Sequence, residues 1–418
     1  MFFWLLGLAV HLLVCCGANN NEKEGDILLR FRSALSQASS DATSSKLESW
    51  RANSDPCVDS WVGIKCASVD TQGQESVSEI ELVDMELAGN INALSELRSL
   101  QNLKHLALYN NLLSGSIPDS ILSLTRLELL RLDRNRITGA VPSGILNPSK
   151  MPLLSYLDLA ENAIEGHIPG ENHGNNPLGA HLGSQLEQLY LFKNMLTGAI
   201  PANLWQLSAL KELRLDQNML SGGLSIPTST GSDPDSNKGK LAFLQYLDVS
   251  RNAFSGPLEQ VLGLGEGKER KEGEKEGEGG IISSVPAMPA LQELFMYHNL
   301  FSGPISPSFC DLKHLSGIRL DSNRLTGAVP ACLHEMENLR VLGLGNNPFL
   351  ENVYALPSEM DNEYSRNFTM NGRTCRRSLL AFNGTEGEEE EDIEEEDMSV
   401  STKNEGLVFR VNGTRKSF

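Results

Sequence analysis

The chain has 418 residues and a formal net charge of −19, with 54 acidic residues against 35 lysines and arginines. Ten of the negative charges lie between residues 386 and 397, in the segment EGEEEEDIEEED, a composition typical of disordered chain. Because phosphate binding needs clustered Lys and Arg, this balance argues against a nucleic-acid partner. The length suggests two or three domains, unless the chain is a repeat array, which grows without one large central core.

The chain begins with an apolar run at residues 2–14 that is followed by the small residues Gly17 and Ala18. The run is too short to cross a bilayer comfortably, so we expect a signal peptide at residues 1–18. It lacks the basic residues usual before such a run, which leaves an uncleaved anchor as the alternative. We therefore predict a secreted, extracellular protein, with or without association with the cell surface.

An amphipathic helix is predicted ahead of the repeats, because Ile27, Leu28, Phe31 and Leu35 fall on one helical face. We interpret it as part of an N-terminal cap at residues 19–76.

Residues 77–352 repeat the pattern L-x-x-L-x-L-x-x-N-x-L, followed by a tail of the form S/T-G-x-I-P. Repetition at such a period is the signature of a leucine-rich-repeat solenoid, and we predict an α/β solenoid of about ten coils whose leucines point inward. The asparagine can satisfy backbone groups where the chain leaves its strand, so we assign it a structural role. These ladder asparagines are Asn111, Asn135, Asn162, Asn194, Asn218, Asn252, Asn299, Asn323 and Asn347.

Three insertions interrupt the predicted array, near residues 170–183, 229–240 and 263–287. The first two are rich in Gly, Ser, Asn and Pro, and the third mixes glycine with charges of both signs. Such compositions favour flexible loops. After the array we predict an acidic, disordered tail at residues 353–418, with glycosylation sequons at Asn367, Asn383 and Asn412.

Several motifs resemble plant-type leucine-rich repeats, the subclass of receptor-like kinases, receptor-like proteins and polygalacturonase-inhibiting proteins. They are L-S-G-S-I-P at 113–118, I-T-G-A-V-P at 137–142 and L-T-G-A-I-P at 196–201. The segments L-x-x-W at 47–50, D-P-C at 55–57 and W-x-G-I-x-C at 61–66 are similar to the N-terminal cap of that family. The resemblance implies a right-handed superhelix and a disulfide between Cys57 and Cys66, although their eight-residue separation is slightly longer than the commonest family spacing.

Three further cysteines follow in the chain. Cys310 and Cys332 lie at similar positions after their ladder asparagines in adjacent coils, so they could form a second disulfide. A two-residue offset between them leaves that pairing open. Cys375 would then be free or would join another chain.

Strand alternation predicts which side chains flank the inward leucines and face a partner on the concave side. Aromatic residues gather at these positions, and Arg–Asp pairs recur two residues apart. Exposed aromatic patches tend to mark interaction sites, whereas the Arg–Asp pairs are also explained by surface ion pairs that contribute little. The predicted ligand-binding residues are Tyr109, Arg131, Tyr190, Phe192, Arg214, Tyr246, Phe295, Tyr297 and Arg319.

No catalytic, metal or cofactor motif is complete in the sequence: the zincin-like stretch at 334–338 lacks its second His, and no kinase, P-loop or hydrolase signature is present. We therefore expect no enzymatic activity and no cofactor. The predicted function is recognition of an extracellular protein, peptide or glycan, with a receptor kinase as one candidate partner. The alternatives are an inhibitor of a polysaccharide-degrading enzyme, a structural matrix protein, and a chain cut short before a membrane helix and kinase.

Overall fold

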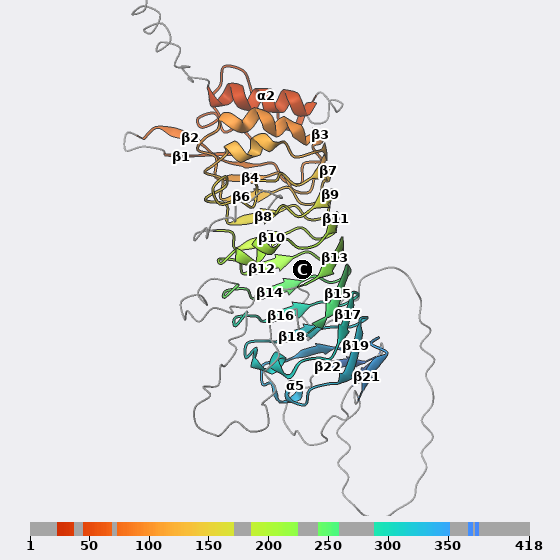
Figure 1. Ribbon diagram of the computed structural model, residues 1–418. Coiled ribbons are helices and arrows are strands. Elements are labelled where there is room, and N and C mark those ends of the chain that lie inside the picture. Colours follow the sequence, from red (N-terminus) through yellow and green to blue (C-terminus); the bar gives the residue numbers. More distant parts are fainter. Residues whose placement is uncertain are drawn as a thin grey trace, which may run out of the picture. The chain divides into compact units, whose positions relative to one another are not determined.

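The computed structural model describes residues 23–36, 45–68, 73–170, 185–224, 241–258, 288–351, 367–370 and 373–375. The predicted signal peptide, the insertions except Gly170, and most of the acidic tail lie outside these ranges. Within them the coils stack one upon another in chain order (Figure 1).

Two parallel stacks of short strands build the array, one on each side of a leucine core. The first, which we call the inner sheet, has 13 strands in the order β1-β2-β4-β6-β8-β10-β12-β14-β16-β18-β20-β22-β23. Its terminal pairs are antiparallel and all other neighbours are parallel. The bounds are β1 Ile64–Ser68, β2 Glu75–Glu81, β4 His105–Ala107, β6 Leu129–Arg131, β8 Tyr156–Asp158, β10 Gln188–Tyr190, β12 Glu212–Arg214, β14 Tyr246–Asp248, β16 Glu293–Phe295, β18 Gly317–Arg319, β20 Val341–Gly343, β22 Asn367–Met370 and β23 Arg373–Cys375.

The second sheet, which the sequence pattern did not predict, has 10 strands and forms from the residues just after each ladder asparagine. Seven of its strands contain the S/T-G motif, whose glycines adopt positive φ, for example 88° at Gly115, where other residues are strained. Its strands are β3 Ala88–Asn90, β5 Leu112–Gly115, β7 Arg136–Ala140, β9 Ala163–His167, β11 Met195–Gly198, β13 Met219–Gly223, β15 Ala253–Pro257, β17 Leu300–Gly303, β19 Arg324–Ala328 and β21 Phe349–Glu351.

In several coils a short helical element follows the strand of the second sheet. Four are 3₁₀ turns, and three of these start at or next to a proline, which fixes φ and donates no N–H. These elements are η1 Ile91–Ser99, η2 Asp119–Ser123, η3 Ala202–Gln206, η5 Pro307–Asp311 and the α-helix α5 Cys332–Glu335.

The core is a column of aliphatic side chains contributed one coil at a time. The central residue of each inner strand pairs with its equivalent in the next, as Leu189 does with Leu213 and Leu213 with Leu247. All three are fully buried, and each such leucine contributes about 1.5–3 kcal/mol relative to exposure. No coil could bury this face alone, which is why stacking decides the fold.

The asparagine ladder is confirmed, and each member bonds to two coils. Asn299 Nδ2 donates to the Met296 carbonyl of its own coil at 3.1 Å and to the Val249 carbonyl of the preceding coil at 3.0 Å. Its Oδ1 accepts from the Phe254 N–H at 3.0 Å. The residue before each ladder asparagine takes a left-handed backbone without being glycine, as at His298 with φ of 53°.

The predicted capping helix is present as α2, Glu24–Ser36, and buries the four predicted residues. Two tryptophans complete the cap: the Trp50 and Trp61 rings stack at 5.5 Å. Their indole N–H groups donate to the Val62 carbonyl at 2.9 Å and the Ser54 hydroxyl at 2.8 Å. The cap therefore covers the first coil with aromatic surface while leaving neither indole donor unpaired.

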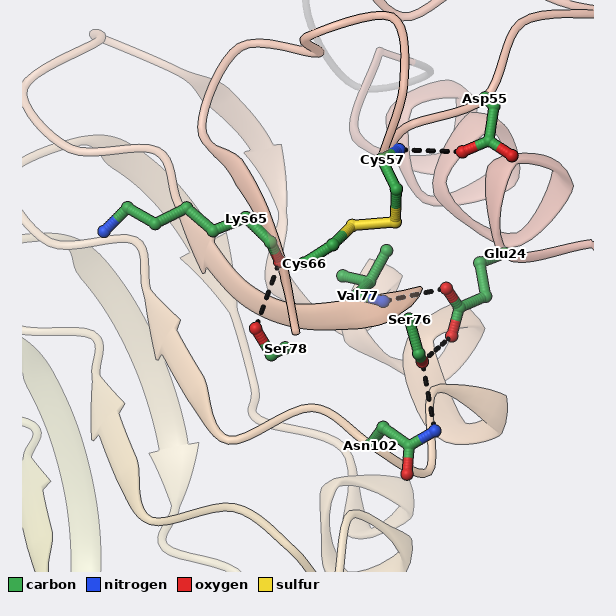
Figure 2. The surroundings of a disulfide bond; sticks show 9 residues. All are labelled: Glu24, Asp55, Cys57, Lys65, Cys66, Ser76, Val77, Ser78 and Asn102. Carbon is green, nitrogen blue, oxygen red and sulfur yellow. Dashed lines mark hydrogen bonds between the residues drawn. A yellow bond between two sulfur atoms is a disulfide. The ribbon is translucent and has the colours of Figure 1, made fainter. Parts of the chain in front are cut away.

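The predicted Cys57–Cys66 disulfide forms at the cap, with a Cα–Cα distance of 5.6 Å. Figure 2 shows that Glu24 of α2 holds the adjacent strand: its carboxylate accepts from the Val77 N–H at 2.8 Å and the Ser76 hydroxyl at 2.5 Å. Asn102 Nδ2 donates to the same hydroxyl at 3.0 Å. The cap helix and the first coils are thus joined by polar contacts as well as by the core.

The second disulfide, left open by the sequence, joins Cys310 in η5 to Cys332 in α5 with a Cα–Cα distance of 6.0 Å. This value lies within ordinary disulfide geometry, so the two-residue offset is absorbed by the short helical turns. Beyond the array, β22 pairs with β20, and two segments that we expected to be disordered tail instead extend the inner sheet. Cys375 ends β23, and the sequon Asn367 begins β22; Asn383 and Asn412 lie outside the described residues.

Candidate functional site

The nine predicted ligand-binding residues lie on the strands of the inner sheet or two residues after them, on the outward side of the sheet, which we call the strand face. Tyr190 and Arg214 are register partners on β10 and β12, and Asp248 and Phe295 are partners on β14 and β16. Because the strands are in register, side chains at equivalent positions form columns along the array.

Three of these residues are arginines, and each is held between a ring and a carboxylate. Such a group, which we call a clamp, consists of a ring in one coil, an arginine in the next coil and the aspartate two residues later. The guanidinium carbon lies 3.8 Å from the ring centroid in clamp 1, 4.1 Å in clamp 2 and 4.4 Å in clamp 3. The members are Tyr109, Arg131 and Asp133 in clamp 1; Phe192, Arg214 and Asp216 in clamp 2; and Tyr297, Arg319 and Asp321 in clamp 3.

The ion pairs within the clamps are partly shielded from water. The Nε–carboxylate distances are 3.3 Å for Arg131, 3.4 Å for Arg214 and 3.1 Å for Arg319. The three carboxylates are 7, 3 and 13 % exposed, while the arginine side chains are 29, 33 and 36 % exposed. The sequence-based interpretation of plain surface ion pairs is therefore wrong in one respect: the aspartates are mostly buried beneath the arginines.

The aromatic residues are half-buried, whereas the sequence predicted exposed rings for Tyr190, Phe192, Phe295 and Tyr297. Neighbouring rings and guanidinium groups cover them: Tyr246 and Phe295 meet edge-on at 5.5 Å. The Tyr190 hydroxyl donates to the Glu212 carboxylate. The rings are consequently fixed in position before any partner arrives, which lowers the ordering cost of binding.

Aspartates of neighbouring coils lie close enough for one carboxylate to raise the pKa of the next. Burial, and then the nearby Asp133 carboxylate, raise the pKa of Asp158 to about 7. Burial and the Asp216 carboxylate raise the pKa of Asp248 to about 6. The Asp248 oxygen also accepts from the Ser250 N–H and hydroxyl, at 2.9 and 2.6 Å. Both carboxyl groups therefore hold their protons to a higher pH than an exposed aspartate does.

Tyr156 and Glu212 also belong to this face, although neither was among the predicted residues. Tyr156 meets Tyr190 edge-on at 5.5 Å, and burial raises the pKa of Tyr156 to about 12. Both residues open their strand, in the same column as the predicted Tyr246. Reading that column along the whole array would have found them.

The described residues contain no group of three or more His, Cys, Asp or Glu side chains placed to hold a metal ion. They also contain no helix long and apolar enough to cross a membrane.

Comparison with known families agrees with this architecture. Residues 21–67 match the leucine rich repeat N-terminal domain, and residues 102–124 and 290–312 match the Leucine Rich Repeat. The chain therefore carries a leucine rich repeat N-terminal domain followed by leucine-rich repeats.

Its curated relatives include receptor-like kinases and receptor-like proteins of Arabidopsis thaliana. Pollen receptor-like kinase 3 is 36 % identical over 110 residues, covering 26 % of this chain and 16 % of that protein. Receptor-like protein 32 is 29 % identical over 253 residues, covering 60 % of this chain and 22 % of that protein. The chain thus matches less than a quarter of the length of either relative.

Solved structures with a similar fold include ectodomains of plant receptor kinases. The ectodomain of the receptor kinase GASSHO1/SCHENGEN3 from Arabidopsis thaliana, in complex with CASPARIAN STRIP INTEGRITY FACTOR 2, matches at 25 % identity and a TM-score of 0.55, covering 77 % of this chain and 35 % of that chain. PEPR1–AtPEP1 matches at 25 % identity and a TM-score of 0.52, covering 78 % of this chain and 41 % of the other. A plant ice-binding protein shares the fold, at 22 % identity and a TM-score of 0.50 over 80 % of this chain and 99 % of its own length.

Proposed function

We propose that the chain is a non-catalytic extracellular recognition protein that binds a peptide or protein partner on the strand face. The observation that carries the proposal is the row of fixed rings and guanidinium groups at Tyr190, Phe192, Arg214, Phe295 and Arg319. Aromatic and arginine side chains held in place are the residues that most often dominate binding energy.

Three further facts support this proposal. GASSHO1/SCHENGEN3, whose ectodomain resembles this chain, has a bound partner, CASPARIAN STRIP INTEGRITY FACTOR 2. Two disulfides in the described residues suit an oxidising, extracellular location. The relatives are receptor-type proteins, which favours recognition over the alternative of an enzyme inhibitor.

The test is affinity capture from extracellular fluid, with identification of the bound proteins by mass spectrometry. The bait is the chain from Asn19 onward, beside a Phe192→Ala, Phe295→Ala, Tyr297→Ala variant. A matched control, Phe243→Ala with Phe349→Ala, removes two rings that are 60 and 62 % exposed outside the strand face.

We expect a secreted polypeptide or a receptor ectodomain to be retained by the unaltered chain and the control and lost from the strand-face variant. Capture of a polysaccharide-degrading enzyme would replace the proposal with the inhibitor function. Identical recovery by all three baits would refute binding on the strand face.

A further inference from the structure

The three clamps recur at equal intervals along the array. The arginines lie at the ends of β6, β12 and β18, and the sheet order places two strands between β6 and β12 and two between β12 and β18. In all three clamps, the aspartate follows the arginine by two residues and the ring belongs to the preceding coil. The strand face is therefore periodic in units of three coils.

The sequence carries the same period. The coil after clamp 1 contains Tyr156-Leu157-Asp158, and the coil after clamp 2 contains the identical Tyr246-Leu247-Asp248. The two coils of each clamp are joined by connections of one length, since their ladder asparagines lie 24 positions apart in every case. These ladder pairs are Asn111 and Asn135, Asn194 and Asn218, and Asn299 and Asn323.

The distance between successive clamps matches a whole number of residues in an extended polypeptide. Neighbouring strands lie about 4.7–4.9 Å apart, so clamps three strands apart are separated by about 14 Å. An extended chain advances about 3.3–3.4 Å per residue, and four residues therefore cover the same distance.

The chemistry of each clamp selects a neutral oxygen acceptor. The aspartate occupies the Nε side of the guanidinium and the ring covers one of its planes, while Nη1 meets no acceptor among the described residues. That nitrogen can donate to a ligand oxygen. The aspartate, which is mostly buried, offsets the positive charge of its arginine. The clamp therefore has little net charge to attract a ligand carboxylate, whereas the free N–H can still donate to an amide carbonyl.

We infer that the partner contains one extended polypeptide segment that lies along the array and presents carbonyl oxygens to the three clamps at four-residue intervals. This inference rests on the proposed function and specifies its ligand. A segment of about nine residues reaches from the first clamp to the third.

The experiment starts from a displayed library of random 12-residue peptides selected on the full chain. Enriched peptides are synthesised and their affinities are measured for the unaltered chain and for Arg131→Lys, Arg214→Lys and Arg319→Lys. Lysine keeps the positive charge beside the aspartate but loses the planar fork of N–H donors. We expect each substitution to weaken binding about tenfold, the effect of losing one hydrogen bond from a charged donor.

Truncation then tests the register. Removing four residues from one end of a peptide should abolish its sensitivity to one terminal clamp, Arg131 or Arg319, and preserve the tenfold sensitivity to the other two. Circular dichroism of each variant confirms that the fold is kept.

Enriched peptides that depend on a single clamp, or that stay sensitive to all three after truncation, would overturn the register and leave the proposed function intact. Failure of the unaltered chain to retain any peptide better than the Phe192→Ala, Phe295→Ala, Tyr297→Ala variant would overturn both.

Discussion

Replacing one ladder asparagine, Asn299, tests the main polar support of the array. In Asn299→Ala the carbonyls of Met296 and Val249 each lose one donor, but both keep a bond from the asparagine of a neighbouring coil, at 3.0 and 3.2 Å. The Phe254 N–H, by contrast, loses its Oδ1 acceptor in a buried position. An orphaned buried donor costs about 1–3 kcal/mol and the lost bonds about 1 kcal/mol more, so the expected loss of unfolding free energy is about 2–4 kcal/mol.

The substitution Asn299→Asp separates the two roles of the side chain. It keeps an oxygen to accept from the Phe254 N–H but turns an oxygen toward the carbonyls and buries a charge. We expect it to destabilise the array at least as much as alanine does. The matched control is Asn338→Ala, which removes one exposed bond to the Lys313 carbonyl at 2.8 Å and should change stability by less than about 0.5–1 kcal/mol.

The assay is urea unfolding followed by circular dichroism, with hydrogen exchange at the Phe254 amide as a local readout. The alanine variant should show a lower urea midpoint and faster exchange at that amide. Equal midpoints for the Asn299→Ala and Asn338→Ala chains, or an aspartate variant more stable than the alanine one, would refute this account of the ladder.

Three further predictions concern other parts of the array. The pKa values of Asp158 and Asp248 are raised in the folded chain, so as the pH rises these carboxyls ionise in the unfolded chain before they do in the folded one. The unfolding free energy should therefore fall as the pH rises from about 4 to 7. In urea titrations from pH 4.5 to 7.5 the Asp158→Asn, Asp248→Asn chain should show a weaker dependence of unfolding free energy on pH, and the same dependence as the parent would contradict this account. The double substitution Cys310→Ala, Cys332→Ala removes the second disulfide, whose cysteines have a sequence separation of 22. It should lower the unfolding free energy by about 3 kcal/mol and also lower the melting temperature. The same melting temperature as the parent would count against a structural role for this disulfide. In Gly343→Ala the new Cβ would clash with the Asp321 carboxylate of clamp 3. Affinity measurements should show weaker binding of any ligand that depends on clamp 3, with the contacts to clamp 1 unaltered.

The sequence predicted the regular parts of this molecule because they follow from periodicity. Leucine spacing gave the coils and the inner sheet, the recurrence of Asn299 and its equivalents gave the ladder, and helical spacing gave the cap helix. The second sheet and the left-handed backbone at positions such as His298 were not predicted, because both arise from stacking of neighbouring coils rather than from local preference.

The candidate site was predicted in position but not in arrangement. Strand alternation placed Phe192 and Arg214 on the same face. Their stacking depends on side-chain directions across two coils, which one strand's pattern does not contain. For the same reason the half-burial of the rings was missed, since the group covering Phe192 comes from the next coil. The use of these residues in binding stays a prediction.

The hydrogen bonds of the ladder keep nearly the same length however many residues connect two neighbouring coils. Asn299 reaches a carbonyl 50 positions earlier at 3.0 Å, and Asn323 reaches one 27 positions earlier at the same 3.0 Å. Extra residues between two coils therefore add loop-closure entropy, which grows slowly with length, without altering the distance between neighbouring coils. An engineer could insert a tag or a small domain at residues 259–287 and expect the spacing of the three clamps to be preserved.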